Sequence, residues 1–163
     1  VVDDNAMVLR NIKAILEKNY SVSVAPSGVH AFISIGKKVP DLILLDVKQF
    51  NDERHRTLTE RSNEQTLKTA EWLENHGKPF WMRYVLVQGY SAFEEDIRAL
   101  GERFKNYQML QRIEILPYHT LGVHKYEAMG KEYKLKHVKE NTNEQLEDVR
   151  KLFEAYFPIV YIN

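Results

Sequence analysis

The stretch DLILLDV, residues 41–47, indicates a parallel α/β fold. It is a continuous apolar run with an acid, Asp46, next to its end, a pattern typical of a strand buried on both faces of a parallel sheet. Val1 and Val2 also precede acids, Asp3 and Asp4, and we expect them to end a second such strand.

Strand-like and helix-like segments alternate along the rest of the chain. Runs rich in β-branched and aromatic residues predict further strands at residues 21–25, 80–87 and 112–116 and a short terminal strand at residues 159–162. Apolar residues at helical spacing predict helices at residues 6–18, 29–37, 64–77, 92–105 and 144–156.

Five βα units in succession predict a parallel sheet with helices outside it. Two architectures fit this alternation. One is an open, doubly wound sheet of the flavodoxin type, and the other is a piece of a βα barrel. A ligand would bind at the carboxyl ends of the strands in either case. With 163 residues and no linker of low complexity, we expect a single α/β domain over residues 1–163.

The composition narrows the class of protein. Lys plus Arg and Asp plus Glu number 23 each, so charge provides no general attraction to nucleic acid or to an anionic membrane. There is no apolar run of the roughly 20 residues that span a bilayer, and we expect a cytoplasmic protein. The chain has no cysteine, which excludes disulfides and thiolate-bound metals within it.

Residues 1–47 resemble the start of a response-regulator receiver domain. The strings VVDDN, SVSVAPSG and PDLILLDV carry this resemblance. It implies that Asp46 is phosphoacceptor-like and that Asp3, Asp4 and Asp46 form a site for weakly bound Mg²⁺, which prefers oxygen ligands. The sequence departs from the family at Gln88, where a small hydroxyl residue is expected, and at Leu116, where the Lys of a Lys-Pro pair is expected.

Residues 41–163 resemble the C-terminal half of pyruvate formate-lyase activating enzymes, which are radical S-adenosylmethionine (SAM) enzymes. The strings LLDVKQFNDERHRTLT, WMRYVLVQGYS and IEILPYHTLGVHKYEAMGKEYKL carry this resemblance. It implies that Asp46, Lys48, Arg83 and His119 are the remnant of a SAM-binding site. Lys48 and Arg83 could equally pair with acids at the edge of the sheet.

The two resemblances share one strand, and together they suggest an engineered chimera. The receiver-like half favours a flavodoxin-like sheet of five strands with helices on both faces and strand order 2-1-3-4-5. Because the activase family holds an iron–sulfur cluster on a CxxxCxxC motif that this chain lacks, we expect a scaffold that is not an enzyme, with no catalytic residue, cluster, required cofactor or certain partner. A Mg²⁺-binding receiver module and a residual SAM-binding half of an activase are the alternatives.

Overall fold

The computed structural model describes residues 6–25, 30, 31, 34, 40–120, 123, 130 and 132–163. The chain divides into two compact units, Val1–Asp41 and Leu42–Asn163, and each is described by itself. The single domain expected over residues 1–163 stays a prediction. Asp3 and Asp4, two of the three expected Mg²⁺ ligands, lie outside the described residues.

The first unit contains helix α1 (Ala6–Leu16), as the apolar spacing predicts. Lys13, in the last turn of the helix, forms an ion pair with Glu17, the first residue after it, with an N–O distance of 3.2 Å. Within the strand expected at residues 21–25, only Ala25 is in a β-bridge. The helix expected at residues 29–37 falls mostly outside the described residues.

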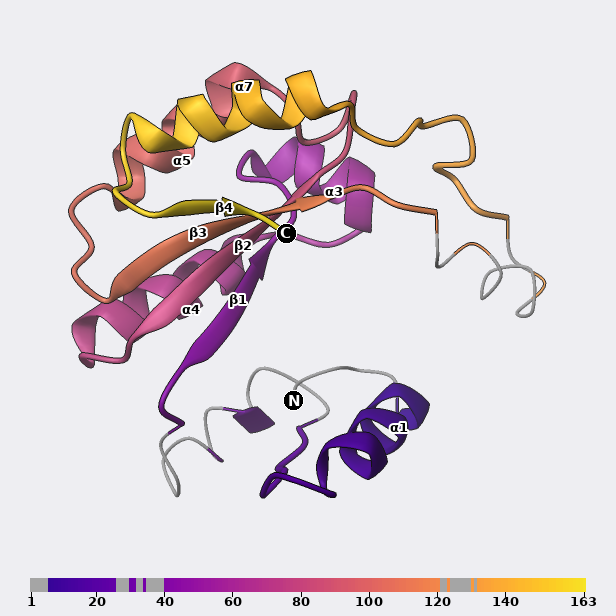
Figure 1. Ribbon diagram of the computed structural model, residues 1–163, viewed down its shortest axis with the longest axis vertical. Helices are drawn as coiled ribbons and strands as arrows, with labels where there is room; N and C mark the ends of the chain where they lie inside the picture. Colours follow the sequence, from indigo (N-terminus) through magenta and orange to yellow (C-terminus); the bar gives the residue numbers. More distant parts are fainter. Residues whose placement is uncertain are drawn as a thin grey trace. The chain divides into compact units, whose positions relative to one another are not determined.

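The second unit is built on a parallel sheet of four strands, β1 (Ile43–Val47), β2 (Phe80–Leu86), β3 (Leu110–Pro117) and β4 (Val160–Ile162). The strands lie side by side in the order of the sequence, as Figure 1 shows. In the predicted flavodoxin-like order the strands that correspond to β1, β2 and β3 are also neighbours in sequence order, so the order of the first two predicted strands stays a prediction. The predicted five strands are not found in the described part of the chain. Alternation of strands and helices is common to barrels and open sheets, so it does not determine the side on which each crossover adds the next strand.

In the described part of this unit, four helices accompany the sheet: α3 (Asp52–Thr59), α4 (Glu64–Asn75), α5 (Glu94–Phe104) and α7 (Asn143–Glu154). In Figure 1, α5 and α7 run side by side. The start of α7 is a capping box in which Thr142 Oγ1 accepts from Gln145 N and Gln145 Oε1 accepts from Thr142 N. The boundaries of β2, α4, α5 and α7 lie within two residues of those predicted.

One face of the sheet carries the hydrophobic core. Alternate residues of β2 are fully buried, because a strand turns successive side chains to opposite faces. They share a single cluster with the buried residues of α4, α5 and α7, so these three helices cover the same face of the sheet. Helices on both faces, as predicted, are not found among the described residues of this unit. The β2 residues of the core are Phe80, Met82, Tyr84 and Leu86.

The opposite face of the sheet, here called the open face, is polar and aromatic. On β1 it presents Asp46 and Leu44, whose side chain is 46% exposed. The expectation that residues 41–47 are buried on both faces is therefore wrong, because the helices of this unit pack on one face only and β1 lies at an edge. The open face consists of Leu44, Asp46, Trp81, Arg83, Val85, Arg112, Glu114, Leu116 and Tyr161. Val85 packs against a small second cluster formed by Val87, Tyr118 and Val138.

Across the described ranges, no helix is both long and apolar enough to span a membrane.

Candidate functional site

The residues that the activase resemblance singles out lie towards one edge of the sheet. Asp46 is the fourth residue of β1 and Lys48 is the first residue after it. Arg83 is near the middle of β2, and His119 is the second residue after β3. Parallel strands end at the same edge of a sheet, which is where α/β proteins bind ligands. The structure thus brings residues from three strands to the carboxyl edge of the sheet.

Asp46 and Arg83 form an ion pair across the open face. They are register partners on β1 and β2. Arg83 Nε donates a hydrogen bond of 2.6 Å to Asp46 Oδ1, and Arg83 Nη2 lies 2.6 Å from the same oxygen. The side chains are 32% and 40% exposed, so water still reaches both groups. Pairing with an acid was one of the two roles expected for Arg83, the other being SAM binding. The ion pair holds the guanidinium next to Asp46 of β1.

Lys48 and His119 are exposed at the same edge. Within the described part of the chain, neither side chain has a hydrogen bond or an ion pair. Their polar atoms are therefore accessible to a ligand. A lysine ammonium binds carboxylates and phosphates, and a histidine ring donates or accepts hydrogen bonds to hydroxyls and amides.

The loop between β2 and α5 is anchored by Ser91, which is fully buried. Ser91 Oγ donates to Val85 O at 2.7 Å and accepts from Val87 N at 2.8 Å. Tyr84 Oη donates to Ser91 O at 2.7 Å. Gly89 has a φ of +76°, a conformation that favours glycine. The loop therefore has a fixed path from the end of β2 to α5.

Helix α3 was not predicted from the sequence, although Asn51 followed by two acids is a helix-start signal. Asn51 Oδ1 accepts from Arg54 N at 3.1 Å. Two further acids, Asp96 and Glu95 of α5, bind Arg54 at 2.6 and 2.9 Å. Arg54 also lies over the Phe93 ring, with its guanidinium carbon 3.8 Å from the ring centroid. These contacts hold α3 against the start of α5.

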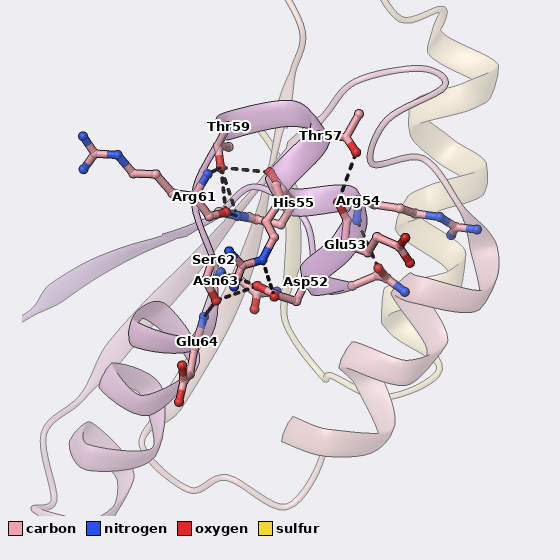
Figure 2. A network of polar contacts seen from close by, with 12 residues as sticks. Asp52, Glu53, Arg54, His55, Thr57, Thr59, Arg61, Ser62, Asn63 and Glu64 are labelled. Carbon is pink, nitrogen blue, oxygen red and sulfur yellow. Dashed lines mark hydrogen bonds and ion pairs between the residues drawn. The ribbon is translucent and has the colours of Figure 1, made fainter.

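A second polar network joins the beginnings of α3 and α4 (Figure 2). Asp52 Oδ1 accepts from Ser62 Oγ at 2.6 Å and from Asn63 N at 2.9 Å, while Asp52 Oδ2 accepts from Arg56 Nε at 2.8 Å. These hydrogen bonds, above all that from Ser62, lower the pKa of Asp52 to about 2. In the same network, His55 is 8% exposed and its Nδ1 lies 2.7 Å from Arg61 O.

The segment after β3 is held by Tyr118, the neighbour of His119. Tyr118 N donates to Asn141 Oδ1 at 2.8 Å, and Tyr118 Oη lies 2.8 Å from Tyr133 Oη. Burial, together with the hydrogen bond between Tyr133 and Tyr118, raises the pKa of Tyr133 to about 12. The Tyr133 phenol is therefore neutral at pH 7, and its hydrogen bond with Tyr118 helps to fix the loop that presents His119.

No cluster of three His, Asp or Glu side chains that could hold a metal ion is found among the residues that the structure describes. Asp46 belongs to the ion pair with Arg83. The Mg²⁺ site of Asp3, Asp4 and Asp46 and the phosphoacceptor-like role of Asp46 stay predictions.

Sequence comparison identifies relatives along most of the chain, although no protein-family model matches it. The pyruvate formate-lyase 1-activating enzyme of Escherichia coli K12 is 44% identical over 119 residues, 73% of this chain and 48% of the relative. The activating enzyme of Streptococcus mutans is 38% identical over 154 residues, 94% of this chain and 53% of the relative. Most of this chain is homologous to pyruvate formate-lyase-activating enzymes. It spans about half the length of these two curated relatives.

A solved structure has the same fold along the whole chain. It is a domain of the pyruvate formate-lyase-activating enzyme from Bacteroides vulgatus, with a TM-score of 0.68 and 17% sequence identity. The match covers 100% of this chain and 98% of that domain. At this level of identity the likeness concerns the fold alone.

These relatives correct three expectations from the sequence. The chimera is wrong, since the match to the Streptococcus mutans activating enzyme covers 94% of the chain and so extends into the first unit; no comparison supports a receiver domain. The inactive scaffold is also wrong, because an activating-enzyme fragment fits the relatives better. The absence of cysteine does not exclude an enzyme, since this chain spans only about half of relatives that are named as enzymes.

Proposed function

We propose that this chain is the SAM-binding part of a pyruvate formate-lyase-activating enzyme and that its protein substrate is a pyruvate formate-lyase. The observation that supports this most is the location of Asp46, Lys48, Arg83 and His119. They come from three neighbouring parallel strands or the loops after them, within a chain whose relatives carry that name.

The chemistry of these four side chains fits the polar groups of SAM. The methionine part of SAM has a carboxylate, which Lys48 and Arg83 can bind as cations. SAM also has an ammonium group. Arg83 binds Oδ1 of Asp46, and Oδ2 of the same carboxylate can accept a hydrogen bond from this ammonium. His119 can hydrogen-bond a ribose hydroxyl or a base nitrogen.

The chain does not fit an iron–sulfur cluster, because such clusters are held by cysteine thiolates and this sequence has none. Any cluster would take its ligands from outside these 163 residues. The residues of this chain bind and orient SAM in this proposal, and the electron transfer that cleaves it is not assigned to them.

Isothermal titration calorimetry of the chain with SAM tests the proposal. We expect one site, with Lys48→Ala and Arg83→Ala each weakening binding by about tenfold, since a hydrogen bond to a charged group contributes roughly 1.5–3 kcal/mol. A loss of binding supports the proposal only if the variant is folded. Each variant is therefore first checked by urea unfolding.

Matched controls come from the helical side of the unit. Lys151 on α7 has a side chain that is 68% exposed, and Arg98 on α5 pairs with Glu94. Lys151→Ala and Arg98→Ala remove the same charges far from the carboxyl edge of the sheet and should leave SAM affinity unchanged. Absence of binding to the unmutated chain, or equal losses in the controls, would contradict the proposal.

A further inference from the structure

Gln49 has a fully buried side chain beside the candidate site. It follows Lys48 directly, and its exposed fraction is 0%. A buried amide costs free energy unless its polar atoms are hydrogen-bonded, so its position is determined by its partners. Nothing in the sequence distinguishes this residue from the many glutamines that lie at protein surfaces.

The amide of Gln49 is bound at both ends. Its Nε2 donates to Tyr90 O at 2.8 Å, and its Oε1 accepts from Asn51 N at 3.0 Å. A carbonyl can only accept and a peptide N–H can only donate, so these two partners fix the orientation of the amide. The main-chain oxygen of Gln49 accepts from Asn63 Nδ2 at 3.1 Å.

These hydrogen bonds join the loops that follow two neighbouring strands. Gln49 and Asn51 lie after β1, and Tyr90 lies after β2, next to Ser91, which fixes that loop. Asn63, at the start of α4, is 3% exposed and holds the loop after β1 from the other side. The main chain at Lys48 is therefore fixed relative to the strand that carries Arg83.

We propose that Gln49 is a positioning residue that fixes the main chain of Lys48 at the carboxyl edge of the sheet, so that Lys48 and Arg83 bind the same carboxylate. The inference rests on the proposed SAM-binding function. A lysine side chain has several rotatable bonds, and a mobile backbone would add to the entropy lost when the ligand binds. Gln49 fixes this backbone before the ligand binds, so the backbone loses little further entropy on binding.

A double-mutant cycle separates positioning from general stability. Gln49→Met keeps the length of the side chain and removes both amide hydrogen bonds. In calorimetry with SAM we expect Gln49→Met and Lys48→Ala each to weaken binding by about tenfold, and Gln49→Met to change the affinity by less than about twofold in the Lys48→Ala background. A residue that only stabilised the fold would have the same effect in both backgrounds.

A second measurement needs no ligand. We expect the ¹⁵N order parameter of the Lys48 amide to fall in Gln49→Met and the exchange protection of Asn51 N–H to be lost. The matched control is Gln145→Met, which removes the amide oxygen that accepts a hydrogen bond from Thr142 N at the start of α7. It should change neither the Lys48 amide nor the SAM affinity.

The outcomes distinguish the two proposals. If the unmutated chain binds no SAM, the proposed function is wrong, and the order parameter still tests the role of Gln49. An unchanged Lys48 amide, or equal effects of Gln49→Met with and without Lys48, would overturn the positioning role. If Gln49→Met does not fold, Asn63→Ala takes its place, because it removes the hydrogen bond to Gln49 O and should act in the same direction.

Discussion

Arg83 and Asp46 are register partners on neighbouring strands, and two nitrogens of the guanidinium lie 2.6 Å from one carboxylate oxygen. Both residues belong to the SAM-binding site that we propose. The pair is also partly open to water, so its contribution to folding and its contribution to binding should be separable.

Replacing Asp46 by Asn tests this separation. The side chains of the pair are 40% and 32% exposed, so we expect the free energy of unfolding in urea to change by less than about 1 kcal/mol, as for other ion pairs near a surface. SAM affinity should nevertheless fall, because the acceptor for the ligand's ammonium becomes neutral. A loss of several kcal/mol of stability would show that the pair is structural.

The network at Asp52 predicts a dependence of stability on pH. Folding lowers the pKa of Asp52 from 3.8 to about 2, chiefly through the hydrogen bond from Ser62. A carboxyl with a lowered pKa contributes stability that is present above about pH 4 and is lost as the pH falls to about 2. The melting temperatures of the unmutated chain and of Asp52→Asn should therefore differ at pH 5 and converge near pH 2.

The pKa of Asp52 can also be measured directly by following its carboxyl carbon by NMR. Ser62→Ala removes the largest cause of the shift, so the measured pKa should rise towards 3.8 in that variant. Thr69→Ala, on the exposed side of α4, serves as the control and should leave the pKa of Asp52 near 2. An ordinary pKa in the unmutated chain would contradict the network.

Gly101 of α5 lies against the ring of Tyr156, two residues after the end of α7. A Cβ atom at this position would lie 2.3 Å from Tyr156 Cδ2. Alanine favours a helix over glycine by about 1 kcal/mol, but overpacking costs typically 1–3 kcal/mol. Gly101→Ala should therefore lower the free energy of unfolding in urea, and the added substitution Tyr156→Ala should recover part of the loss. A gain in stability from Gly101→Ala alone would mean that the ring moves aside freely.

The sequence predicts the elements of the second unit better than their arrangement. Apolar periodicity locates β2, α4, α5 and α7 because each buries one regular face in the core. Strand order is not encoded in that periodicity, so the sequence alone does not distinguish a flavodoxin-like sheet from a piece of a barrel. Helix α3 was missed because only His55 is buried in it, so its sequence has no apolar stripe.

The candidate site shows the same limit. Motif resemblance identifies Asp46, Lys48, Arg83 and His119, which lie in three neighbouring strands or directly after them. It does not identify Gln49 or the true role of Asn63. By residue type either Ser62 or Asn63 could cap α4; in the structure Ser62 Oγ accepts from Glu64 N, and the Asn63 amide donates to Gln49 O. Such roles depend on which loops meet in space, and residue type alone does not reveal them.

The last prediction concerns Glu114, which is 3% exposed although it lies on the open face. Its carboxylate is bound by Arg112, whose guanidinium carbon lies 3.3 Å from the centroid of the Trp81 ring. Arg112→Met keeps an apolar side chain on the indole but leaves the buried carboxylate without its partner. Breaking a buried pair costs roughly 3–5 kcal/mol; Arg112 is 25% exposed, so we expect the lower end, about 3 kcal/mol, in urea unfolding at pH 7.

The double variant Arg112→Met with Glu114→Gln removes the unpaired charge and should be more stable than Arg112→Met alone. If the two substitutions are instead additive, the stability of the open face does not depend on this pair, and the burial of Glu114 has another cause.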